Sequence, residues 1–205
     1  MALLYKFPKS KAVRVIALYG ITFFLLLFFY KKVPKQHKQL IQTIYTFAEY
    51  SFFTILILFN IENKKIRRFI FFASLGFLVF QVVYFFQSKL VRLDSVPIGI
   101  ETILIFFFIV CYFFEFDKKA SPVYVYEMYI FWISVGILLY LGGSFFFYIL
   151  INHLNPAEID EFGNLTYVAE IIKNVMFSVA IAIYMKHRKE NVDSKIENVP
   201  HLDIF

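Results

Sequence analysis

Six runs of about 20 mostly apolar residues leave this chain very few folds to choose from. Each run is long enough to cross the hydrocarbon core of a bilayer as a helix, and the 205 residues leave only short connections between them. Helices satisfy their backbone hydrogen bonds internally, as lipid requires. We therefore predict an all-α polytopic membrane protein, a six-transmembrane-helix bundle with spans at 13–30, 39–60, 69–87, 96–115, 130–152 and 166–185.

The composition excludes a soluble globular domain. Hydrophobic residues make up 60% of the chain and aromatic residues 21%, which is too much apolar surface for a water-soluble protein of this size to cover. The predicted organisation is a basic cytoplasmic N-terminus at 1–12, a transmembrane domain at 13–185 and a flexible cytoplasmic tail at 186–205. The abundance of Phe, Ile, Lys and Asn suits an AT-rich bacterial genome, so we expect a bacterial inner (plasma) membrane, multi-pass location.

The distribution of positive charge predicts the orientation. Lys and Arg near span ends favour the cytoplasmic side. With six spans and an inner N-terminus, fourteen of the 21 Lys and Arg lie inside and six outside, and Lys173 lies within a span. If the first run did not span, the remaining five spans would divide the same loop charges ten to ten. Six spans with both termini cytoplasmic are therefore predicted.

The segment YKKVPKQHK, residues 30–38, places four lysines on the predicted outer side. Two interpretations remain open for it. It is either an outer basic loop that touches anionic lipid or a partner, or a sign that the first run is re-entrant.

The second, fourth and sixth predicted spans each contain an acidic residue in the outer half. At 1.5 Å per helical residue, Glu101 lies roughly 8 Å below the start of its span, Glu49 roughly 15 Å and Glu170 roughly 6 Å. Lys173, the only cation within a span, lies just beneath Glu170 together with Asn174. A charge facing lipid costs at least about 2.5–3.5 kcal/mol, so these side chains should face one another or water.

Helical spacing supports an inward orientation of the polar residues. Gln42, Thr46 and Glu49 share one helix face; the sets Thr166–Glu170–Asn174–Ser178 and Ser74–Gln81–Ser88 repeat every four and every seven residues. We predict a polar, outward-opening cavity that binds a small ligand or a proton, in which Lys173 offsets Glu49 and at least one Glu is protonated or reached by water. The candidate residues are Glu49, Glu101, Glu170, Lys173, Asn174, Gln81 and Tyr140.

A structural interpretation of the same residues stays open. Glu49 and Glu101 are also explained as neutral acids that hydrogen-bond neighbouring helices, and Glu170 as an acid near a helix N-terminus. In the fifth span, Gly136 and Gly143 lie seven residues apart on one face and predict close helix packing. No nucleophile–base pair, metal-ligand spacing or phosphate loop is present, so we predict neither a catalytic site nor a metal site, no cofactor and no enzyme activity.

Four stretches carry a resemblance to a known kind of protein: IYTFAEYSFF, DSVPIGIE, FWISVGILLYLGGSFF and IIKNVMFS. Together they resemble small multi-spanning bacterial membrane proteins of uncharacterised function, similar in plan to the membrane sensor halves of two-component kinases. The resemblance implies that Glu49, Glu101, Trp132, Tyr140 and Asn174 are the positions to watch.

The sequence therefore predicts an integral membrane sensor or regulatory subunit. Its expected partners are the lipid bilayer and a membrane kinase or another membrane-complex subunit, but not nucleic acid, because the basic residues lie in short clusters beside the spans. The alternatives are a small transporter or channel that uses Glu49 and Glu101 as cation or proton sites, and a purely structural membrane subunit. Against transport, the inner halves of the spans are almost entirely Phe, Ile, Leu and Val.

Overall fold

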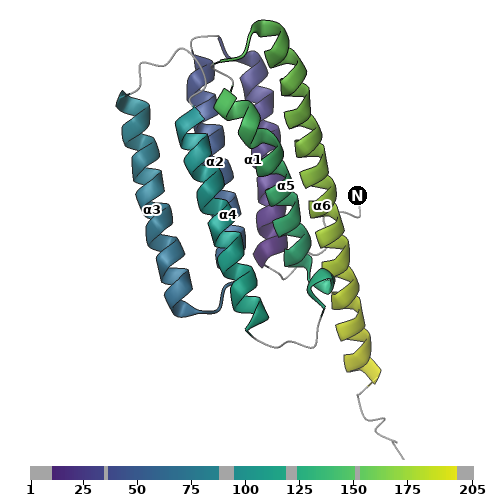
Figure 1. The fold of residues 1–205 in the computed structure, drawn as a ribbon. Helices are drawn as coiled ribbons and strands as arrows, with labels where there is room; N and C mark the ends of the chain where they lie inside the picture. The colour runs from purple at the N-terminus through teal and green to yellow at the C-terminus, as the bar shows by residue number, and fades with distance from the viewer. Residues whose placement is uncertain (1–10, 35–36, 88–94, 119–123, 151–152, 198–205) are drawn as a thin grey trace, which may run out of the picture.

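The structure is a computed structural model that describes residues 11–34, 37–87, 95–118, 124–150 and 153–197. These ranges contain six α-helices, the short 3-10 helix η2 and no strand (Figure 1). The elements are α1 (Lys11–Lys32), α2 (Lys38–Leu58), α3 (Lys64–Gln87), α4 (Ser95–Asp117), η2 (Val125–Glu127), α5 (Tyr129–Leu150) and α6 (Pro156–Glu197). All six helices are long and apolar enough to cross a membrane. The prediction of an all-α chain with six candidate spans is therefore confirmed.

The first apolar run forms α1, a continuous helix of 22 residues. Its length and hydropathy make it a candidate membrane span, as they do for the other five helices. Consecutive helices run in opposite directions (Figure 1). We call the end where α1 gives way to α2, and α5 to α6, the upper end of the bundle.

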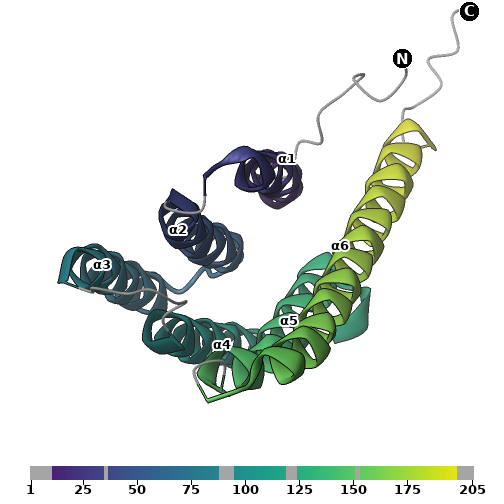
Figure 2. The ribbon, with the colours of Figure 1, turned by 90° about the horizontal axis from the view of Figure 1, so that it is seen from above.

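The helices form a curved row when they are viewed from above (Figure 2). α5 and α6 pack along each other, α4 packs on α5, and α2 packs on both α1 and α4, while α3 lies outside against α2 and α4. Between α1 and α6, Tyr19 meets Phe177 with ring centroids 5.8 Å apart. The row therefore curves around an interior that five helices share.

The core of the bundle is built largely from α2 and its neighbours. Phe53 and Leu56 of α2, Ile105 and Phe108 of α4, and Ile137 of α5 are completely buried. Large apolar side chains also cover the outside of the bundle, where a soluble protein would place polar groups. This surface and the six apolar helices are compatible with a multi-pass membrane protein.

The bounds of α6 differ from the predicted span at 166–185. The helix begins earlier because Asn155 and Glu158 form a capping box: the Glu158 N–H donates to Asn155 Oδ1 (3.0 Å) and the Asn155 N–H donates to Glu158 Oε2 (2.9 Å). This arrangement satisfies two backbone donors at the helix start, and Pro156 suits the first helical position.

α6 also continues to Glu197, where the sequence analysis predicted a flexible tail from residue 186. Residues 186–197 contain neither Gly nor Pro, the residues that most often end helices. This part of the predicted tail is helical in the structure, and residues 198–205 lie outside the described part of the chain.

The two glycines predicted to support helix packing face α6. A Cβ at Gly136 would lie 2.9 Å from Met176 Cβ and 3.3 Å from the Lys173 carbonyl oxygen, and one at Gly143 would lie 3.0 Å from Ala169 Cβ. A Cβ at Gly142 would meet nothing within 4 Å. The close approach of α5 and α6 therefore depends on Gly136 most of all.

We expect Gly136→Ala to lower the free energy of unfolding by about 1–3 kcal/mol, the usual cost of overpacking. The matched change Gly142→Ala should be neutral or stabilise by up to about 1 kcal/mol, because alanine favours helix more than glycine does. Unfolding in detergent by titration with sodium dodecyl sulfate, followed by circular dichroism, measures both. Equal effects of the two changes would contradict close α5–α6 packing at Gly136.

Candidate functional site

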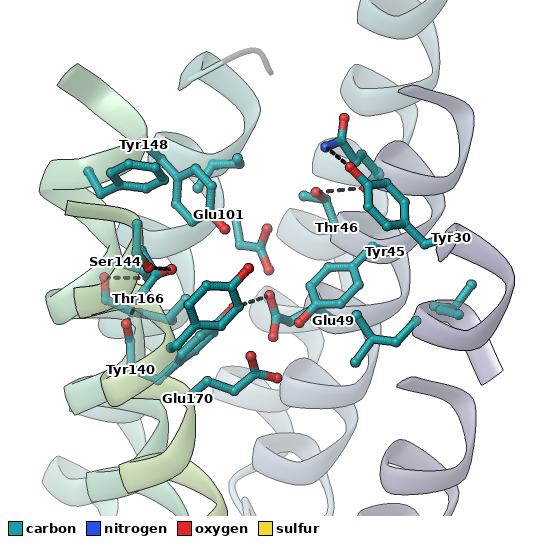
Figure 3. Close-up of a pocket in the computed structure, with 18 of the residues that line it drawn as sticks. Tyr30, Tyr45, Thr46, Glu49, Glu101, Tyr140, Ser144, Tyr148, Thr166 and Glu170 are labelled. Atoms are coloured by element: carbon teal, nitrogen blue, oxygen red, sulfur yellow. Dashed lines mark hydrogen bonds between the residues drawn. The ribbon is translucent and has the colours of Figure 1, made fainter. Parts of the chain in front are cut away.

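A cavity of about 680 Å³ lies at the upper end of the bundle. Side chains from α1, α2, α4, α5 and α6 line it (Figure 3), and its volume is typical of small-molecule sites. Its polar lining consists of three acids and several hydroxyl and amide groups. The acids are Glu49, Glu101 and Glu170, and the tyrosines are Tyr30, Tyr45, Tyr140, Tyr148 and Tyr167.

Each acid is brought to the cavity by a helix that begins at the upper end. Glu49 lies three turns into α2 and Glu101 lies in the second turn of α4. Glu170 lies about two turns into the apolar part of α6, which starts at Phe162. Gln42 and Thr46 line the cavity on the same face of α2 as Glu49. Because i, i+4 and i+7 positions share one side of a helix, α2 presents a continuous polar stripe to the interior.

Lys173 is fully buried beneath the cavity and pairs with Glu49. Its Nζ lies 3.4 Å from Glu49 Oε1 and donates to the Tyr19 hydroxyl at 2.5 Å. The Tyr19 hydroxyl in turn donates to Glu49 Oε1 at 3.3 Å. One cluster therefore links α1, α2 and α6 at the depth where the cavity ends.

Tyr140 of α5 completes this cluster. Its hydroxyl donates to Glu49 Oε2 at 3.0 Å (Figure 3), and the centroid of its ring lies 3.7 Å from Lys173 Nζ. A cation over the face of a tyrosine ring is attracted by the ring quadrupole. Glu49 thus receives hydrogen bonds on both carboxylate oxygens, and the ammonium of Lys173 is held by a carboxylate, a hydroxyl and a ring.

Glu101 has a different environment. It is only 2% exposed, it lines the cavity, and its Oε1 has no hydrogen-bond partner. An unpartnered buried polar atom usually costs about 1–3 kcal/mol, and no described group of the chain donates a hydrogen bond to this oxygen.

Glu170 lines the cavity but does not pair with Lys173, although the two lie three residues apart on α6. Among the described residues, the ion pair of Lys173 is with Glu49. This is the pair that the sequence analysis predicted when it set Lys173 against Glu49. The side chain of Lys173 reaches across the bundle to α1 and α2, where Tyr19 and Glu49 supply both a hydroxyl and a carboxylate.

The remaining predicted residues lie away from the cavity. Gln81 is buried on α3, which contributes nothing to the lining, and Asn174 lies on an exposed face of α6. Trp132 lies near the lower end, where its Nε1 donates to the Tyr126 carbonyl at 2.8 Å. The structure therefore brings Glu49, Glu101, Glu170 and Tyr140 to one cavity, with Lys173 beneath it, but not Gln81 or Asn174.

The sequence analysis did not identify Tyr19, nor the tyrosines that line the cavity besides Tyr140, which are Tyr30, Tyr45, Tyr148 and Tyr167. Tyr19 lies well inside α1, away from the span ends where aromatic belts are expected. A tyrosine so deep in a span suggests that its hydroxyl has a partner inside the bundle, and this was the signal available in the sequence. Tyr30 accepts a hydrogen bond from Gln42 Nε2 at 3.3 Å. This contact ties α1 to α2 at the upper end of the cavity.

Comparison with protein-family models, with curated proteins and with solved structures found no match for the chain.

Proposed function

We propose that the chain is a multi-pass protein of the bacterial inner membrane, with both termini cytoplasmic, that acts as a sensor or regulatory subunit. In this proposal the cavity opens to the outer side of the membrane and binds a small polar or cationic ligand. Occupancy is relayed to a cytoplasmic or membrane partner, such as a membrane kinase.

The observation that carries this proposal is that the cavity ends inside the bundle. Glu49 lines its floor and Lys173 lies beneath, and the buried side chains one helical turn further down include the apolar Phe53, Ile137 and Phe177. A transport path would need polar groups that continue toward the lower end. A cavity closed by packed apolar side chains suits binding better than passage.

The position of Lys173 gives the cavity a connection to the lower end. α6 carries Lys173 and extends beyond the other helices at the lower end of the bundle (Figure 1). A ligand that approaches Glu49 competes with Lys173 for the carboxylate. Such a ligand favours conformations in which the contact of α6 with α1 and α2 is weakened. It therefore increases the fraction of molecules in the conformation that a partner recognises.

The test is ligand-induced stabilisation of the full chain in lipid nanodiscs. The probes are a panel of small amines, carboxylates, alcohols and sugars. At a hundredfold excess over Kd, a binder should raise the Tm by roughly 5 °C or more. Thr166→Trp, which fills the cavity, should remove the shift, whereas Ser178→Trp on the exposed face of α6 should keep it.

The same compounds then separate sensing from transport. A compound that binds should not accumulate in proteoliposomes that contain the protein. Accumulation that Thr166→Trp abolishes would replace the sensor proposal with transport. Failure of every compound to stabilise the native chain would remove the ligand-binding proposal altogether.

A further inference from the structure

The charge of the cavity indicates the class of its ligand. Its described lining contains three carboxyl groups and no Lys, Arg or His. Lys173, which lies beneath, is paired with one of the three, Glu49. Glu101 and Glu170 are left as acidic groups that an entering cation would neutralise and an entering anion would meet with repulsion.

Glu101 supplies a specific contact for such a cation. The residue is almost completely buried, it faces the cavity (Figure 3), and its Oε1 lacks a hydrogen-bond partner. A bound donor would satisfy this atom. Since a charged donor forms a stronger hydrogen bond with a carboxylate than a neutral one does, an N–H group of a cation fits best.

The floor of the cavity shows how this chain holds a buried ammonium group. Around Lys173 Nζ lie a carboxylate oxygen, a tyrosine hydroxyl and the face of a tyrosine ring, at 3.4, 2.5 and 3.7 Å. The upper part of the cavity contains the same kinds of group, with Glu101 as the acid and Tyr45 and Tyr148 among the rings. Tyrosine rings and carboxylates together favour organic ammonium ions.

The geometry does not suit a bare metal ion. Among the described residues, no three His, Cys, Asp or Glu side chains lie close enough together to hold one. The volume of about 680 Å³ is also far larger than a single ion or proton requires, and apolar side chains such as Ile98, Leu141 and Phe147 share the lining. An organic group bearing a positive charge uses both the acids and this apolar surface.

We infer, on the basis of the binding function proposed above, that the ligand is a small organic ammonium ion. Its ammonium group binds Glu101 and the neighbouring tyrosine rings, and its hydrocarbon part lies against the apolar lining. The site is thereby selective for positive charge over neutral or anionic compounds of the same shape.

Three compounds of nearly equal size test this inference: benzylamine, benzyl alcohol and benzoate, titrated into the full chain in nanodiscs at pH 7 and followed by calorimetry. Benzylamine, which is protonated at this pH, should bind at least tenfold more tightly than the other two. Glu101→Gln keeps the size of the side chain and removes its charge. It should weaken benzylamine binding at least tenfold, and Tyr148→Leu should weaken it several-fold.

The outcomes separate this inference from the proposed function. If benzyl alcohol or benzoate binds as tightly as benzylamine, and Thr166→Trp abolishes that binding, the cavity is a ligand site but the ammonium assignment is wrong. If none of the three binds but a sugar or another uncharged or anionic compound of the panel does, the cavity is again a ligand site and the ammonium assignment is again wrong. If Glu101→Gln does not fold, the three-compound comparison on the native chain and the Tyr148→Leu titration decide the matter.

Discussion

Lys173→Leu should lower the free energy of unfolding by about 3–5 kcal/mol, the usual cost of removing one partner from a buried ion pair. Leucine fills much of the space of the lysine stem. The loss therefore comes from Glu49, whose Oε1 faces Nζ at 3.4 Å in a site where Lys173 has no exposed surface. Without the ammonium, Glu49 must either keep an uncompensated charge or take up a proton, and both cost free energy.

A double-mutant cycle separates the ion pair from simple packing. Glu49→Gln should also destabilise, because it leaves Lys173 buried without its carboxylate. The double variant Glu49→Gln/Lys173→Leu should recover most of the loss, since replacing a whole buried pair is often neutral. Lys65→Leu, a change at an exposed lysine on α3, should stay within about 0.5 kcal/mol. Additive losses in the cycle would contradict the pair.

The helices were predictable because apolar length is a property of the sequence itself. The predicted spans match α1 to α5 within a few residues, except at the start of α3, where Lys64 to Arg68 begin the helix ahead of the apolar run at 69. A hydropathy scan finds the part of a helix that suits lipid, whereas capping groups and helix propensity decide where the helix starts and ends. The NPAE sequence at 155–158 was the signal that the scan passed over at the start of α6.

Helical spacing predicted the lining of the cavity only for residues that lie one or two turns apart on the same helix. Each residue advances about 100° around an α-helix, so a repeat of four drifts by about 40° per step. Thr166 and Glu170 therefore face the cavity, but Asn174, a further step along, has rotated to the exposed face. Lys173, seven residues after Thr166, lies only about 20° from it around the helix, on the side opposite to this drift, and points inward.

Glu49 was predicted as the carboxylate that offsets Lys173, but the hydroxyl partner Tyr19 was not predictable from the helix of Lys173. Glu170 is adjacent on α6, but a buried lysine takes the direction that the surrounding packing allows. Tyr19 comes from a helix more than 150 residues away in sequence, and only the tertiary arrangement places its hydroxyl beside Nζ. Long-range contacts of this kind leave no local periodicity to detect.

Glu101→Leu is expected to stabilise the bundle by about 1–3 kcal/mol, the free energy that an unsatisfied buried polar atom costs, while it removes the binding of benzylamine. If Glu101 had only a structural role, its removal would lower the stability of the bundle. A gain of stability together with a loss of benzylamine binding therefore identifies a role in binding. Residues kept for binding commonly reduce stability in this way. Chemical unfolding and calorimetry on the same variant measure the two effects.

Glu115 provides the matched control, since it is a second buried glutamate on α4. Its Oε1 accepts the backbone N–H groups of Glu62 and Asn63 at 3.0 and 3.1 Å, at the connection between α2 and α3. Glu115→Leu leaves these donors without the carboxylate and should therefore destabilise by about 1–3 kcal/mol, with benzylamine binding unchanged. Opposite signs at the two glutamates would identify Glu101 as the one held for a ligand. A loss of stability at both would instead make Glu101 a structural group of the helix bundle.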